Sequence, residues 1–135
     1  MPSYAQLFSF YGKLAAVLVH KSDLGVRIKE AYDRKEKDVL KEIGYDENKI
    51  VVCDDKKAID AAPEDAILIV GDYRLVAECG ITALVECTGN TAVSSDAALF
   101  ALKKGINVYM VSKETDSVCG PLLNQVAAEN NAVYA

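Results

Sequence analysis

The stretch "ALVECTGNTAVSSDAALFALKKGINVYMVSKE", residues 83–114, decides the fold. An apolar run stops at Glu86 and is followed by Cys-Thr-Gly-Asn. A helical segment comes next, and a second apolar run then stops at Ser-Lys-Glu. Two strands that end in polar residues, joined by a helix, are typical of a parallel sheet whose ligands lie beyond the carboxyl ends of the strands. The stretch therefore predicts one edge of a ligand crevice.

From residue 50 onward, apolar runs of strand length alternate regularly with segments of helical pattern. Strands are expected at "KIVVC", "AILIVG", "ITALVEC", "INVYMVS" and "AVYA". Helices are expected at "DDKKAIDAA", "DYRLVAEC", "NTAVSSDAALFALKKG" and "TDSVCGPLLNQVAAENN". Continuous apolar strands that alternate with helices indicate a sheet covered on both faces. The predicted fold class is α/β, a Rossmann-like doubly wound and mainly parallel sheet with helices on both faces, formed by one domain over residues 1–135.

The first fifty residues leave alternatives open, because short apolar runs fit the periodicity of a helix as well as that of a strand. "YGKLAAVLVHKSD" is a helix packed on the sheet, or "AAVLV" within it is a strand. "LGVRIKEAYDRKEKDVLKEIG" is one long helix, or a strand that turns into a helix at "RKEKDVLKEIG".

The chain has 135 residues, of which 51% are hydrophobic and 26% charged, and its formal net charge is -5. This balance predicts a folded domain and argues against nucleic-acid binding, which needs a basic face. "LAAVLV" is far shorter than the about 20 apolar residues of a membrane span. No secretory signal is evident, so the predicted location is cytoplasmic, away from the membrane.

The four cysteines, at positions 53, 79, 87 and 119, form no Cys-x-x-Cys pair. The single histidine, His20, has no ligand partner at helical spacing. No metal site is predicted. Cys53, Cys79 and Cys87, which adjoin apolar strands, are interpreted as buried free thiols, and Cys119 as a packing residue in a helix.

The segment from about residue 63 to residue 135 resembles the NAD(P)-binding domain of homoserine dehydrogenase-like oxidoreductases, in the reductoisomerase-like and SAF-domain-containing branch. Three short motifs in order carry the resemblance: Glu86 with Thr88–Asn90, then Ser112–Glu114, then Gly120–Leu123. The resemblance implies a cofactor, NADP or NAD.

The same resemblance implies a register for the N-terminal half. "LGVRIKEAYDRK" becomes the second strand, and Asp33 and Arg34 at its end meet the adenosine ribose and a 2′-phosphate. The alternative places both on a charged helical face. Gly12 takes the third glycine place of the G-x-G-x-x-G turn, and the first two places fall on Leu7 and Ser9. This departure leaves the first strand and glycine turn degenerate or missing.

By resemblance, Thr88, Gly89, Asn90 and Ser112 lie near the cofactor, and Lys113 takes part in proton transfer. Alternatively, Asn90 or Thr91 caps the following helix, and Lys113 is a solvated lysine that pairs with Glu114 or Asp116. Relatives of this family carry substrate groups in a further domain, so we expect activity of this chain alone to be absent. The chain is then one part of a split oxidoreductase or a fragment of one. The alternative is a non-catalytic remnant that serves as an oligomerisation or interaction module, with a homo-oligomer or a catalytic-domain chain as partner.

Overall fold

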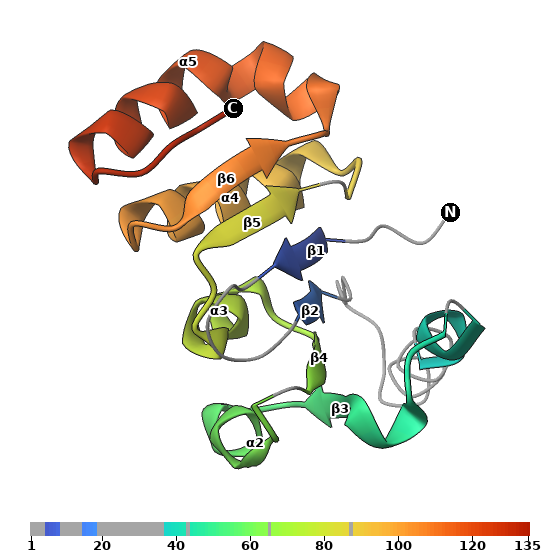
Figure 1. Ribbon diagram of the computed structural model, residues 1–135. Helices are drawn as coiled ribbons and strands as arrows, with labels where there is room; N and C mark the ends of the chain where they lie inside the picture. The colour runs from blue at the N-terminus through green and yellow to red at the C-terminus, as the bar shows by residue number, and fades with distance from the viewer. Residues whose placement is uncertain (1–4, 9–14, 19–36, 43, 65, 87) are drawn as a thin grey trace.

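A computed structural model of the chain describes residues 5–8, 15–18, 37–42, 44–64, 66–86 and 88–135. Six short strands form one sheet in the order β3-β4-β2-β1-β5-β6 (Figure 1). The strands are β1 (Ala5–Phe8), β2 (Ala15–Leu18), β3 (Ile50–Cys53), β4 (Ile67–Val70), β5 (Ala83–Glu86) and β6 (Asn107–Met110). The helices are α2 (Lys56–Ala61), α3 (Tyr73–Val76), α4 (Thr91–Lys103) and α5 (Lys113–Glu129), with 3-10 turns η1 (Glu47–Lys49) and η2 (Ala77–Cys79). Residues 37–42 are also helical.

The sheet is mixed. Parallel pairings fall into two blocks, β3-β4-β2 and β5-β6. Between the blocks lies β1, which is antiparallel to β2 and to β5. An antiparallel strand in the middle of the sheet leaves no continuous parallel array.

The predicted Rossmann-like doubly wound, mainly parallel sheet is therefore wrong, and the physical reason lies in the first eighteen residues. A dinucleotide fold needs a strand, a glycine turn and a helix in this region. The structure has two neighbouring antiparallel strands instead, so residues 15–18 within "YGKLAAVLVHKSD" are a strand and not a helix. Alanine and β-branched valine in "AAVL" suit a strand. From residue 50 onward, β3 to β6 and α2 to α5 lie at the predicted segments, whereas "AVYA" contributes only a bridge between Val108 and Tyr134.

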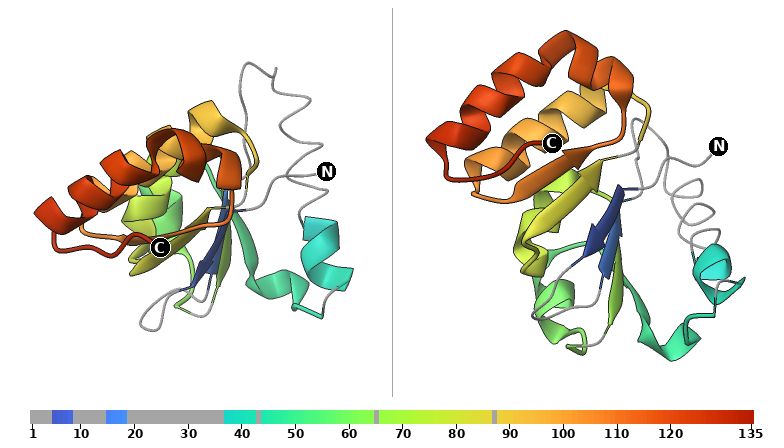
Figure 2. Two further views of the ribbon diagram at one scale, coloured as in Figure 1. Left: turned by 90° about the horizontal axis from the view of Figure 1, so that it is seen from above. Right: turned by 45° about the horizontal axis from the view of Figure 1, so that its top comes forward.

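Two layers of side chains cover β4, whose four residues are all buried. Leu68 and Val70 belong to the main core, which extends over α4, α5 and β6. Ile67 and Ile69 point to the other face and pack with Leu40 from the helix at residues 37–42. Figure 2 shows this helix on one side of the sheet and α2 to α5 on the other. A strand that is buried on both faces explains the continuous apolar run "ILIV".

Candidate functional site at the ends of β5 and β6

The carboxyl ends of β5 and β6 lie side by side because the two strands pair in parallel, with Glu86 opposite Met110. The Val111 N–H extends the ladder and donates to the Glu86 carbonyl at 2.8 Å. The polar residues after each strand are thereby brought to one place at the edge of the sheet. The structure thus joins the two halves of the predicted crevice edge.

A hydrogen bond connects the two loops. The Gly89 N–H donates to Ser112 Oγ at 3.0 Å, and Ser112 is buried. Gly89 has a φ of 71°, in the left-handed region that favours glycine, and a Cβ there would meet nothing within 4 Å. Ser112 occupies the N-cap position of α5 but makes no side-chain cap bond. Its hydroxyl instead holds the β5–α4 loop.

Thr88 and Asn90 make hydrogen bonds within the β5–α4 loop and the first turn of α4. Asn90 is the N-cap of α4, and its Oδ1 accepts a hydrogen bond from the Val93 N–H at 3.2 Å. The Asn90 N–H in turn donates to Thr88 Oγ1 at 3.3 Å. The capping alternative for Asn90 is confirmed, since the side chain satisfies one of the free N–H groups of the first helical turn.

Lys113 begins α5, and its side chain is exposed beside the buried Ser112. The acidic residues Glu114 and Asp116 lie in the first turn of the same helix, where negative charge is favourable. The other site residues expected from the sequence, Gly12, Asp33 and Arg34, lie outside the described residues.

The ends of β3 and β4 are also followed by helix caps. Asp55 Oδ1 accepts from the Ala58 N–H at 2.8 Å at the start of α2. Asp72 Oδ1 accepts from the Arg74 N–H at 2.9 Å at the start of α3. The Arg74 guanidinium also binds the Asp72 carboxylate at 2.6 Å, and its hydrogen bonds lower the pKa of Asp72. The ends of β3, β4 and β5 therefore each lead into a helix with a capping side chain, whereas α5 after β6 begins without one.

Glu86 was part of the sequence motif, but its burial was not predicted. Only 1% of its surface is exposed. Its Oε1 accepts from the Thr88 N–H at 2.9 Å, and its Oε2 accepts from Ser94 Oγ at 2.6 Å. The one available sequence signal was a glutamate at the end of an apolar strand, followed eight positions later by a serine on the helix. Through these two hydrogen bonds, the Glu86 side chain holds the start of the β5–α4 loop.

A small cavity of about 10 Å³ lies beside Glu86. Glu86 and Thr88 line it together with Tyr73 and Phe100, and aliphatic side chains complete its walls. The two aromatic rings contact edge to face, with 5.7 Å between their centroids. The volume accommodates one water-sized group and not a nucleotide base.

The described residues contain no cluster of three or more histidine, cysteine or acidic residues that could hold a metal ion. In the same part of the chain, no helix is long and apolar enough to cross a bilayer. Cys53 and Cys79 are buried, and Cys119 is partly buried.

Residues 1–60 match the model of one protein family, described as Glycoside Hydrolase 20C C-terminal domain. No curated protein matches the chain. No solved structure matches it either.

These comparisons correct the functional prediction. The matching family is a glycosidase domain and not an NAD(P)-binding domain of an oxidoreductase, so the resemblance to homoserine dehydrogenase-like proteins is wrong. The split-oxidoreductase function that was inferred from it is overturned, and its alternative, an enzyme remnant, gains no support. The mixed sheet agrees with this correction, because a strand occupies residues 15–18 where the resemblance required the helix of the phosphate-binding turn.

Proposed function

We propose that the chain acts as a non-catalytic accessory domain of a glycoside hydrolase, of the type described as the C-terminal domain of glycoside hydrolase 20C. The observation that carries this proposal is the match of residues 1–60 to that family model. The matched segment includes β1, β2 and β3, which supply half of the six-stranded sheet. The similarity therefore involves structural elements on both sides of β4 and not a peripheral extension.

The chemistry of the described carboxylates supports a role without hydrolysis. Glycosidases place two carboxyl groups about 5 to 9.5 Å apart, with a sugar between them. Here Asp55 and Asp72 cap helices, and Glu86 is held beneath a loop by Thr88 and Ser94. The cavity of about 10 Å³ beside Glu86 is smaller than a sugar ring. These carboxylates thus organise the edge of the sheet.

An accessory domain needs a surface for its enzyme, and β6 offers one. Val108 faces the core with α4, so its neighbour Tyr109 points to the opposite face of the sheet. Tyr134 pairs with Val108 and bonds to Asp116 on α5, which directs Val133 to the same face as Tyr109. Tyr109 is 44% exposed and Val133 is 53% exposed. Apolar groups gathered on one sheet face favour contact with another protein surface.

The test mixes the purified chain with the separately purified catalytic domain of a glycoside hydrolase 20C enzyme from which its own C-terminal domain has been removed. Light scattering after size exclusion should show a complex of the two chains. Tyr109→Glu should weaken the complex, because it places a charge on the apolar face. The matched control is Tyr45→Glu, since Tyr45 is a similarly exposed tyrosine in the loop before η1.

A second measurement addresses the non-catalytic part of the proposal. The chain alone should leave a panel of aryl glycosides intact. Hydrolysis by the purified chain that disappears in Glu86→Gln would contradict the proposal.

A further inference from the structure

The outer side of α5 carries exposed apolar side chains. Val118 is 75% exposed and Leu122 is 56% exposed. Pro121, which is also exposed, lies between them in the sequence. Residues three and four positions apart share one side of a helix, so these three side chains form one surface, which we call the α5 patch. The opposite side of α5, with Leu123 and Val126, is buried against α4 and β6.

The charges on the same side of the helix are acidic. Glu114 lies one turn before Val118. Glu129 lies two turns after Leu122. Lys113 is the single basic residue of α5, and its position five residues before Val118 places it about 140° away around the helix axis. The α5 patch is therefore an apolar surface with a carboxylate at each of its two ends.

A backbone acceptor adds to this surface. Pro121 has no N–H, so the Ser117 carbonyl lacks the donor that the residue four positions later ordinarily supplies in a helix. Ser117 is itself exposed. Lysine and arginine head groups carry several donors and bind carboxylate and carbonyl oxygens strongly. The polar groups around the α5 patch thus favour a partner that supplies basic side chains.

These charges distinguish between two possible occupants of the patch. Two copies of the chain packed through α5 would bring Glu114 and Glu129 against the same acidic residues of the other copy, whether the helices run parallel or antiparallel. Like charges placed opposite each other disfavour association. Lysine or arginine at those places in a different protein turns both carboxylates into favourable contacts. The charge pattern therefore favours a basic partner over a second copy.

We propose that the α5 patch is a docking site for an amphipathic helix of another protein, apolar at its centre and basic at both ends. Val118 and Leu122 contact the apolar centre of that helix, as in other pairs of packed helices. Glu114 and Glu129 bind its basic ends. The site goes beyond the accessory role and does not depend on it, since it lies on α5 and not on the β6 surface of Tyr109.

The test uses a synthetic helical peptide as the probe. It matches the 17 residues of α5 in length, and it carries leucines three and four positions apart and two lysines in each terminal turn. Fluorescence anisotropy should show saturable binding of one peptide per chain. A peptide with glutamates in place of the lysines should bind at least about tenfold more weakly. Equal binding of the two peptides, or no saturable binding of the lysine peptide, would overturn the proposal.

A first variant tests the apolar centre. Leu122→Ala removes the branched side chain and keeps a residue that favours a helix, and it should weaken binding of the lysine peptide about fivefold. The control is Tyr45→Ala, because Tyr45 is an exposed apolar residue in the loop before η1. The control should bind like the unaltered chain. Equal binding by these two variants would place the peptide elsewhere and contradict the assignment.

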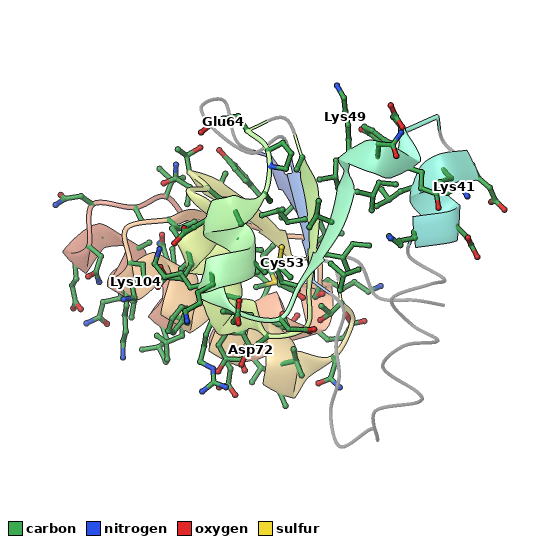
Figure 3. The ribbon with its side chains drawn as sticks, turned by 90° about the horizontal axis from the view of Figure 1, so that it is seen from below. Lys41, Lys49, Cys53, Glu64, Asp72 and Lys104 are labelled. Carbon is green, nitrogen blue, oxygen red and sulfur yellow. The ribbon has the colours of Figure 1, made fainter. Side chains whose placement is uncertain are left out.

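Two double variants test the carboxylates. Glu114→Gln with Glu129→Gln removes the acidic ends of the patch and should weaken binding at least about fivefold. Glu42→Gln with Glu64→Gln removes the same charge elsewhere, because Glu42 follows Lys41 in the helix at residues 37–42 and Glu64 precedes β4 (Figure 3). This control should bind like the unaltered chain. Equal weakening would mean that the peptide responds only to net charge, which would overturn the proposal.

Light scattering of the chain alone tests the other occupant. No association through α5 is expected. A dimer that dissociates in Leu122→Ala would show that a second copy covers the α5 patch, and it would contradict the proposal.

Discussion

The Gly89 N–H donates a 3.0 Å hydrogen bond to Ser112 Oγ, and this contact joins two loops that are 23 positions apart in the sequence. It forms because parallel pairing of β5 and β6 places the starts of α4 and α5 next to each other. Ser112 gives up its role as a helix cap for this contact. The edge that the sequence suggested as a ligand crevice is thus held together by its own polar groups.

Ser112→Ala removes this contact and leaves the Gly89 N–H without its side-chain acceptor. We expect the free energy of unfolding to fall by about 1 kcal/mol. Urea denaturation measures the change. Ser117→Ala is the control on the same helix, because the exposed Ser117 hydroxyl only donates to the Lys113 carbonyl. Equal losses in the two variants would show that the connection between the loops adds nothing.

Asn90→Ala tests the start of α4. The variant removes the acceptor of the Val93 N–H and should lower the free energy of unfolding by about 1 kcal/mol. Asn90→Asp keeps an acceptor at the same position and should restore most of that stability. Thermal unfolding followed by circular dichroism distinguishes the two. A loss of similar size in Asn90→Asp would argue against a capping role.

Gly120 is required beside Asp116. A Cβ at Gly120 would lie 2.5 Å from Asp116 Oδ1, the atom that accepts the Tyr134 hydroxyl at 2.7 Å. Alanine in a helix is otherwise favoured over glycine by about 1 kcal/mol. We therefore expect Gly120→Ala to stabilise the Asp116→Ala variant by about 1 kcal/mol, and to give no such gain in the unaltered chain.

Urea denaturation of the two single variants and the double variant measures this coupling. Additive effects would mean that Asp116 moves away without cost.

The Tyr134 hydroxyl predicts a loss of stability at alkaline pH. Burial raises the pKa of Tyr134 above its ordinary value of 10.0, and the hydrogen bond to Asp116 raises it further. Above pH 10 the unfolded chain releases this proton while the folded chain retains it, so stability falls as pH rises. Below pH 10 the contribution is fully present. The pH dependence of urea denaturation should be steeper for the unaltered chain than for Tyr134→Phe, and parallel curves would contradict this assignment.

The sequence predicted the elements from residue 50 onward because their apolar runs, caps and turn residues agree. Asp55 and Asn90 precede α2 and α4 as caps, as their residue types favour. The runs before residue 50 are too short for periodicity to separate helix from strand, so the antiparallel pair β1–β2 was not resolved.

The site was predicted only in part. Thr88 to Asn90 and Ser112 do meet, as parallel strand ends require. The burial of Glu86 and its bond to Ser94 depend on how α4 packs over β5, which is a tertiary contact that local sequence does not encode. The functional error came from short motifs that fit helix caps as well as a cofactor site.

The most direct test of the accessory-domain proposal is a calorimetric titration of the chain into the catalytic domain of a glycoside hydrolase 20C enzyme that lacks its own C-terminal domain. We expect saturable binding of one chain per catalytic domain, weakened by Tyr109→Glu and unchanged by Tyr45→Glu. The absence of binding with both proteins folded, or equal binding by the two variants, would contradict the proposal.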